Sequence, residues 1–438
     1  MATNSPLRVI VVGGGIGGLA LANGLRRAGV AVSVHEREVR RTDRLQGFRI
    51  HINPHGSAAL AELLSPELFA TFVACSGKGG NGFGFVTEQL SSLIAFDSTD
   101  TVSADCDHYG ISRITLRRIL LAELGDAVRY GSAFDRYERR PDGRVVAHFA
   151  DGGSDVGDVL VGADGGTSRV RAQYLPQAQR VDTGIVTIAG KYALTPSARD
   201  RLDPRLLAHP HSVIPPSGCG MFVAPHEFTP PAPGVALGSD GTELTPGFLF
   251  DDTQPYVFWA FAAERDRFGV DLSALDPAEL HATAVRMTAG WAPALRRLVA
   301  ESDSATATLL PIKTSVPIPR WSPTTVTLLG DAIHSMTPFA GIGANTALRD
   351  AQLLVPDAGR RRPPRARSAR RHRRLRSRDD RLRLRRGPHL AQHRRTRRRR
   401  RQIRPHDRQA RAAHGGRGAV DETQDVRRSR RLRRAARR

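Results

Sequence analysis

The sequence has no uninterrupted apolar run of about 18 residues, so we expect no segment that crosses a membrane. It has only three cysteines, Cys75, Cys106 and Cys219, and their spacing is not that of metal ligands. So few cysteines, and an odd number of them, predict free thiols in a reducing cytoplasm and no metal site. The amino-terminal apolar run lacks a basic leader, which argues against a signal peptide.

The arginine-rich tail, residues 355–438, lacks lysine and all three of Phe, Trp and Tyr. It contains 34 arginines and 7 acidic residues, whereas residues 1–354 contain 32 basic and 36 acidic residues. The formal charge of +23 therefore comes from the tail, and the rest of the chain is mildly acidic. Nucleic-acid-binding segments usually mix lysine with arginine and add aromatic contacts, so this composition does not indicate a specific nucleic-acid partner.

Three interpretations of the tail remain open: a nucleic-acid-binding arm, a disordered extension, or a segment translated in a shifted reading frame of a GC-rich gene. Shifted codons such as CGC and CGG yield arginine. With a one-base shift, residues 372–393 are compatible with an ordinary amphipathic helical sequence. We therefore favour the frame shift, which predicts that the original frame ends near Leu354 or Val355.

The strongest pattern lies between residues 7 and 37. A short apolar run over 9–12 precedes the sequence Gly-x-Gly-x-x-Gly, and a segment of helical apolar spacing then leads to a second apolar run over 30–34. An acidic residue follows that second run. This order is typical of the strand–helix–strand unit that binds dinucleotides, and it is far more specific than the glycines alone.

Each residue of this pattern has a predicted task. Gly13 makes the tight turn, Gly15 lets a pyrophosphate approach the backbone, and Gly18 lets helix and strand pack closely. Glu36 can accept hydrogen bonds from a ribose, and its neighbour Arg37 is included in the predicted cofactor site. An acid at the ribose position disfavours a 2′-phosphate, so the site suits FAD or NAD better than NADPH.

Two later segments, 159–171 and 326–351, repeat the order of strand, turn and helix. The first carries Asp164 in its turn, and the second carries Gly330 followed by Asp331. The loop of the second segment opens a helix whose unpaired N–H groups could hold the carbonyl edge of a flavin. The loop and helix residues assigned to this task are Pro338, Gly341, Gly343 and Asn345.

The three motifs in this order resemble the class A flavoprotein aromatic hydroxylases, the para-hydroxybenzoate hydroxylase-like monooxygenases. Residues 44–60 and 111–120 are most similar to the bacterial branch that modifies antibiotics and polycyclic natural products. The resemblance implies an α/β protein with a Rossmann-like FAD-binding domain and a mixed-sheet substrate domain, and the composition of the arginine-rich tail predicts that it is disordered. The expected boundaries are 1–180 and 311–354 for the FAD-binding domain, 181–310 for the substrate domain and 355–438 for the tail.

The resemblance also implies roles for single residues. Glu36 would bind the adenosine ribose of FAD, and Arg113 stands where the family has an arginine that contacts FAD. Asp164 would lie near the pyrophosphate and help with the pyridine nucleotide, and Asp331 would bind the ribityl or pyrophosphate region. Residues 341–345 would border the isoalloxazine. The alternatives are a simple strand-end acid for Glu36 and a surface arginine for Arg113.

The implied activity is hydroxylation of a small aromatic or polycyclic substrate, with FAD as cofactor, NAD(P)H and O2 as co-substrates, and a flavin hydroperoxide as oxygen donor. The flavin carries this chemistry, so no protein nucleophile is expected. A flavin-dependent reductase or oxidase of the same fold is the alternative activity. A flavin halogenase is disfavoured because the tryptophans do not form the expected signature.

Apolar strands at 187–194, 218–225 and 256–264 are expected to form a substrate sheet over the flavin. Because a strand alternates its faces, about half of the bulky residues on them should belong to the core. His334 is interpreted as a packing residue. The candidate substrate contacts are His51, His55, Met221, Phe222, Phe258, Trp259 and Phe261.

Overall fold

The structure is a computed structural model that describes residues 7–39, 48–78, 82–97, 107–216, 218–227, 255–337 and 341–355. All of these belong to one compact unit, Met1–Arg383. Cys106, Pro338 and the tail beyond Val355 lie outside the described residues, so the expectations about them stay predictions. None of the described helices combines the length and the apolar character that crossing a bilayer requires.

A parallel five-stranded sheet in the order β18-β12-β1-β2-β8 forms the centre of the predicted FAD-binding domain. The run RVIVV of β1 is rich in β-branched residues, and four of its five residues are buried, as the middle strand of a covered parallel sheet requires. The strands are β1 Arg8–Val12, β2 Ala31–His35, β8 Val128–Arg129, β12 Val159–Gly162 and β18 Val326–Leu328.

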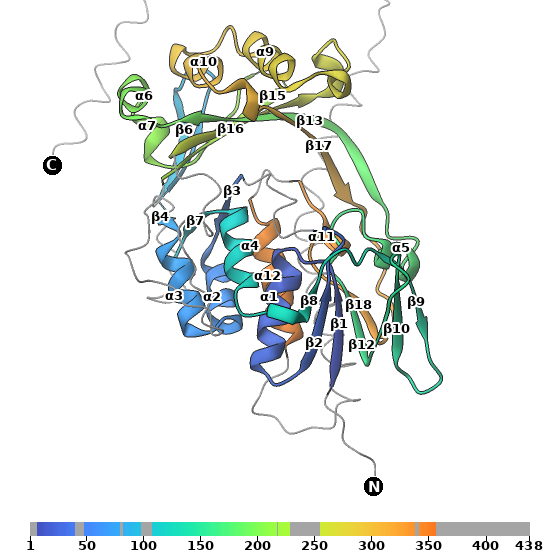
Figure 1. Ribbon diagram of the computed structural model, residues 1–438. Coiled ribbons are helices and arrows are strands. Elements are labelled where there is room, and N and C mark those ends of the chain that lie inside the picture. Colours follow the sequence, from blue (N-terminus) through green and yellow to red (C-terminus); the bar gives the residue numbers. More distant parts are fainter. Residues whose placement is uncertain are drawn as a thin grey trace, which may run out of the picture. The chain divides into compact units, whose positions relative to one another are not determined.

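Helices cover one face of this sheet, and Figure 1 shows α1, α2, α4 and α12 together on that side. Buried Leu and Ile side chains fill the layer between them, and each contributes about 1.5–3 kcal/mol. Two of the helices begin with a proline that a Ser or Asn cap precedes, which explains where they start. The helices are α1 Ile16–Arg27, α2 Pro54–Leu63, α3 Pro66–Ala74, α4 Arg113–Leu121 and α12 Gly343–Leu354.

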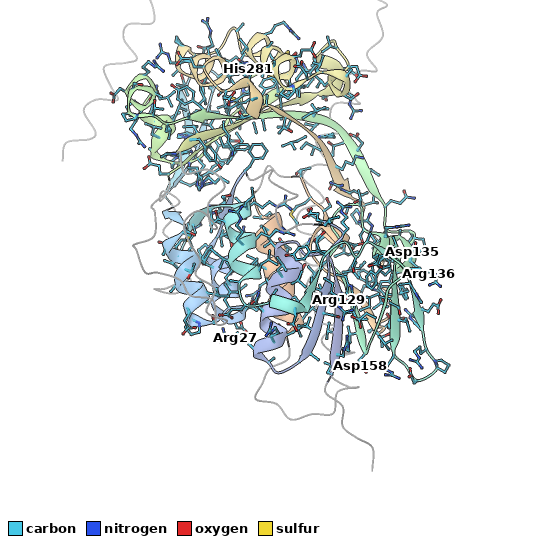
Figure 2. All side chains as sticks on the ribbon, in the orientation of Figure 1. Arg27, Arg129, Asp135, Arg136, Asp158 and His281 are labelled. Carbon is cyan, nitrogen blue, oxygen red and sulfur yellow. The ribbon has the colours of Figure 1, made fainter. Side chains whose placement is uncertain are left out.

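The other face of the sheet packs against a small antiparallel sheet, and its core includes Ile10 and Leu160. A buried carboxylate, Asp155, ties this layer to the central strands, because it accepts from Ser33 Oγ at 2.6 Å and contacts His35 Nε2 at 2.9 Å. Arg129, labelled in Figure 2, lies 3.8 Å from the same carboxylate. The elements of this layer are β9 Phe134–Arg139, β10 Val145–Phe149, β11 Ser154–Gly157, α5 Arg169–Tyr174 and α11 Asp331–His334.

A seven-stranded mixed sheet, β17-β13-β16-β15-β14-β5-β6, contains the three strands expected for substrate binding. It also includes strands from residues 82–97 and 308–315; the first lies outside the range predicted for the substrate domain, and the second extends beyond its predicted end at residue 310. Its strands are β5 Gly82–Val86, β6 Ser92–Asp97, β13 Arg180–Ala193, β14 His211–Val213, β15 Cys219–His226, β16 Tyr256–Glu264 and β17 Thr308–Ser315.

Helices pack against one face of the seven-stranded sheet and enclose a second core. His281 of α9, labelled in Figure 2, lies 2.8 Å from the Val299 carbonyl and so joins α9 to α10. The helices are α6 Pro196–Arg201, α7 Arg205–Ala208, α9 Pro277–Met287 and α10 Pro293–Ala300. A three-stranded antiparallel sheet, made of β3 Arg49–Ile52, β7 Tyr109–Ser112 and β4 Gly77–Lys78, completes the described elements together with short 3-10 turns.

Candidate functional site

The three glycines of the first motif face different surroundings. Gly13 has a φ of +111°, and a Cβ there would lie 2.4 Å from the Ala163 carbonyl oxygen. A Cβ on Gly18 would lie 2.1 Å from the Gly13 carbonyl oxygen. Around Gly15 a Cβ would meet no atom within 4 Å. Packing inside the protein therefore explains two of the glycines, whereas Gly15 keeps an open approach to the backbone.

Helix α1 begins directly at this open position. Gly15 is its N-cap, has extended backbone angles and provides no side-chain cap to the first turn. The N–H groups of the first turn and the positive end of the helix dipole are therefore directed at the space beside Gly15. This arrangement suits a phosphate, because an anion there receives hydrogen bonds from several N–H groups.

Glu36 is buried at the end of β2, next to this loop. Its Oε2 accepts a hydrogen bond from the Gly14 N–H at 2.7 Å, and its Oε1 accepts from the Glu38 N–H at 3.0 Å. The carboxylate thus fixes the glycine-rich loop. Ribose binding would be a second role for the same side chain. Arg37, which follows it, is exposed.

An arginine that the sequence reasoning did not single out lies at the same loop. Arg117 of α4 donates from Nε to the Gly14 carbonyl at 2.9 Å, and its NH2 group lies 3.3 Å from Glu38 Oε2. Arg113, one turn earlier, is the exposed first residue of α4. The spacing of four residues places both arginines on one face of the helix, and this signal could have pointed to Arg117.

Asp164 has a structural task in the second motif. Its carboxylate accepts from Ser168 Oγ at 2.5 Å and from the N–H groups of Arg169 and Val170 at 2.8 and 3.2 Å. It therefore caps the start of α5. Burial raises the pKa of Asp164, although these hydrogen bonds oppose the shift.

The third motif is held in place by a residue that the sequence reasoning missed. Asp350 of α12 accepts from the Gly330 N–H at 2.9 Å and contacts His334 Nε2 in a buried hydrogen-bonded pair. His334 thus packs, as expected, and also joins α11 to α12. Asp331, by contrast, is exposed at the first turn of α11, and Gly330 before it has a φ of +58°. The exposed carboxylate is therefore the one available to a ligand.

Asn345 is buried, and its side chain joins the start of α12 to the segment after β3. Its Nδ2 donates to the carbonyls of His51 at 2.8 Å and Gly341 at 3.2 Å, and its Oδ1 accepts from the Asn53 N–H at 2.9 Å. Gly341 has a φ of +60°, and a Cβ on Gly343 would meet nothing within 4 Å. Asn345 therefore positions the start of α12, while Gly341 and Gly343 leave the backbone there open to the approach of a ligand.

Three of the proposed substrate contacts need correction. Met221 and Trp259 lie in the core between the seven-stranded sheet and its helices, with exposed fractions of 2 % and 0 %. The Trp259 Nε1 donates to Ser302 Oγ at 2.7 Å, and Phe261 lies in the same core. Strand alternation turns these side chains away from the opposite face, so none of them is placed to contact a substrate there.

The opposite face of the sheet carries the other two aromatic candidates. Phe222 and Phe258 form an aromatic cluster with Phe48 and Tyr256, and the rings of Phe48 and Phe258 lie 4.8 Å apart. Phe48 directly precedes β3, so this cluster lies between the substrate sheet and the segment that Asn345 holds. The sequence reasoning named neither Phe48 nor Tyr256.

His51 of β3 contacts a second histidine. Its Nε2 is 3.0 Å from His108 Nδ1, and the two rings stack at 5.0 Å. Burial, followed by the charges of Arg49 and His108, lowers the pKa of His51 to about 3. His51 is therefore neutral near neutral pH, and His55 is exposed on α2.

Comparisons with known proteins agree with the three motifs. A family model described as an FAD binding domain matches residues 284–357. The FAD-dependent urate hydroxylase of Klebsiella pneumoniae is 30% identical over 80% of each chain. The dual O-methyltransferase/FAD-dependent monooxygenase elcB of Phaeosphaeria nodorum is 31% identical over 81% of this chain, which spans only 40% of that protein.

A solved structure from Photorhabdus luminescens, assigned as an FAD-containing monooxygenase, has a TM-score of 0.72 and 32% identity. The alignment covers 85% of this chain and 94% of the other. The shared fold thus extends over nearly all of that protein.

Proposed function

The chain belongs to the FAD-dependent monooxygenases, and from that premise we propose that it hydroxylates a small aromatic or polycyclic compound, with NAD(P)H and O2 as co-substrates. The observation that carries the proposal is the glycine-rich loop. Two of its glycines are required by contacts within the protein, while Gly15 leaves open space at an uncapped helix start. A dinucleotide pyrophosphate fits this combination, because it needs both close approach and unpaired N–H groups.

The residues present fit FAD at each of its parts. The start of α1 would hold the pyrophosphate, Glu36 the adenosine ribose and Asp331 the ribityl–pyrophosphate region. The start of α12, with Gly341 and Gly343, would face the flavin ring. Bound FAD supplies the redox chemistry between NAD(P)H and O2, and the protein supplies position and exclusion of water.

Several side chains would position the substrate. The rings of Phe48, Phe222 and Phe258 offer apolar surfaces on which an aromatic ring can stack. His51, on β3 three residues after Phe48, is neutral near neutral pH and can donate or accept one hydrogen bond. Asn345 keeps the segment that carries His51 in register with α12, so the aromatic cluster and the proposed flavin site share one rigid support.

The thiols are consistent with the reducing compartment that we propose, the cytoplasm. Neither Cys75 nor Cys219 forms a disulfide in the described part of the chain. Burial raises the pKa of Cys75 to about 11, so this thiol is unreactive near neutral pH.

Two measurements test the proposed function. The purified full chain should show the visible absorption bands of bound flavin. With NAD(P)H and isotopically labelled O2, one labelled oxygen atom should enter an aromatic product from a panel of phenols and polyketides. Consumption of NAD(P)H without label in any product would instead support the reductase or oxidase alternative.

A further inference from the structure

We propose that Arg117 is a positioning residue for FAD, because it locks the peptide group between Gly14 and Gly15 so that the Gly15 N–H donates to the pyrophosphate. The inference rests on the proposed placement of the pyrophosphate at the start of α1, and it holds whatever substrate the enzyme hydroxylates. It comes from a side chain of α4 that reaches the backbone of the glycine-rich loop, residues 13–18.

The carbonyl of Gly14 and the N–H of Gly15 belong to one peptide group. Because that group is planar and trans, its C=O and N–H bonds point in opposite directions. Arg117 Nε donates to the Gly14 carbonyl oxygen at 2.9 Å from α4, so the Gly15 N–H is directed away from that arginine. Among the described residues no acceptor receives a hydrogen bond from this N–H. A Cβ on Gly15 would meet no atom within 4 Å, so a ligand can approach this peptide group.

This peptide group needs a constraint from outside the loop. Neither of its two glycines has a Cβ, so the group can rotate at little cost, and a rotated group would present its carbonyl to the phosphate. The preceding peptide group is held by Glu36, whose Oε2 accepts from the Gly14 N–H at 2.7 Å. Arg117 supplies the corresponding constraint for the Gly14–Gly15 peptide group.

Arg117 is itself held from two sides. Its NH2 group lies 3.3 Å from Glu38 Oε2 and 4.0 Å from Glu36 Oε2, and only 14 % of its side chain is exposed. Its helix is fixed against α1, since Asn23 Nδ2 of α1 donates to the Leu120 carbonyl of α4 at 2.8 Å. The planar fork of donors of an arginine can contact a carbonyl and a carboxylate together, so the guanidinium is presented to the loop from a rigid support.

Neutralisation of charge is the alternative explanation for Arg117. The arginine lies beside two carboxylates, and without it Glu36 and Glu38 would repel a nearby pyrophosphate. If Arg117 acts only through its charge, removal of the Glu38 carboxylate strengthens FAD binding. If Arg117 positions the peptide group, removal of that contact loosens the arginine and weakens FAD binding. The bond from Nε to the Gly14 carbonyl favours positioning, because neutralisation requires no such contact.

Binding of FAD to the deflavinated full chain tests the role of Arg117. We would follow flavin fluorescence during titration and measure the thermal melting of each apoprotein. Arg117→Met should weaken FAD binding roughly 10- to 100-fold, because the freed peptide group no longer presents its N–H to the pyrophosphate. FAD affinity equal to that of the parent chain would overturn the proposal, even if the variant melts at a lower temperature.

Arg26→Met is the matched control. Arg26 also joins α1 to the segment after α4, because its NH1 donates to the carbonyls of Glu123 and Leu124 at 2.7 and 3.1 Å, but it does so at the opposite end of α1. Its loss should lower the melting temperature and leave the affinity for FAD unchanged. An equal loss of FAD affinity in Arg26→Met and Arg117→Met would mean that any loosening of these helices impairs binding, which would contradict a specific role for Arg117.

Two further variants separate positioning from charge. Arg117→Lys keeps the charge but lacks the fixed pair of donors, so it should recover only part of the affinity for FAD. Glu38→Ala should weaken FAD binding, because Arg117 loses a contact that holds it. Full recovery in Arg117→Lys, or tighter binding in Glu38→Ala, would show that charge decides and would overturn the proposal.

Gly15→Ala separates the role of Arg117 from the placement of the pyrophosphate. FAD affinity that falls in Gly15→Ala and stays unchanged in Arg117→Met would reject the role of Arg117 and keep the placement. Unchanged FAD affinity in Gly15→Ala, or a parent chain that binds no FAD, would reject the placement itself.

Discussion

The glycine-rich loop and the seven-stranded sheet differ in how a residue acquires its role. In the loop, Gly18 is constrained by the Gly13 carbonyl five positions earlier and Gly13 by its positive φ, although Ala163 of the second motif also leaves no room for a Cβ on Gly13. In the sheet, the neighbours Phe258 and Trp259 have opposite surroundings, one in the aromatic cluster and one in the helix-side core. Local sequence therefore defines the loop, whereas the layers packed on each face define the sheet.

The largest expected effect tests the contrast between the two faces of the seven-stranded sheet. Trp259→Ala should lower the free energy of unfolding by about 3–5 kcal/mol, because it empties a fully buried site and leaves Ser302 without its donor. Phe258→Ala should cost less stability and mainly weaken binding of an aromatic ligand. Denaturant unfolding and ligand titration of both variants would check this. Equal stability losses with unchanged ligand binding would remove the distinction between the faces.

A second test concerns the exposed and buried acids of the third motif. Asp331→Ala should weaken FAD binding by about 1.5–3 kcal/mol, because a charge-assisted hydrogen bond to the cofactor is lost, while the apoprotein melts normally. Asp350→Asn is the comparison, because it disturbs the buried pair with His334 and should lower the melting temperature. Flavin content after gel filtration is the measurement, and unchanged content in Asp331→Ala would refute its role.

The loop itself offers a third comparison. Gly18→Ala should lower the free energy of unfolding by about 1–3 kcal/mol, because the new Cβ meets backbone that cannot move aside. Gly15→Ala has space for its Cβ, so it should melt like the parent chain and lose affinity for FAD. Thermal melting of apoprotein and holoprotein separates these effects. If both variants melt alike and bind FAD equally, the loop does not work as proposed.

The smallest effect concerns acid. His226 has a folded pKa of about 3 because it is buried facing Arg49, Lys191 and Tyr256, so the unfolded chain binds its proton first as the pH falls below 6.5. This residue should therefore reduce stability by on the order of 1–2 kcal/mol near pH 5 relative to neutral pH. His226→Gln should flatten that part of the unfolding profile, and the exposed His55→Gln should not. Identical slopes in all three proteins would argue against a buried neutral His226.

Much of the architecture followed from patterns along the chain. The α/β class, the first strand–helix–strand unit and the strands at residues 187–194, 218–225 and 256–264 were predicted, because period-two and period-3.6 apolar spacing arises within each element. The addition of β5 and β6 to the substrate sheet was not predicted, because pairing between strands so far apart leaves no local signal.

The candidate site divides in the same way. The sequence by itself determined the loop of Gly13, Gly15 and Gly18 and the acid that follows, since the positive φ of Gly13, the contact of Gly18 with Gly13 and the hydrogen bond from Gly14 to Glu36 all lie within one supersecondary unit. Only the tertiary structure decided which face of β16 meets the aromatic cluster, and brought Phe48 beside Phe258. The physical reason is that alternation specifies two faces of a strand but not which one a distant layer will cover.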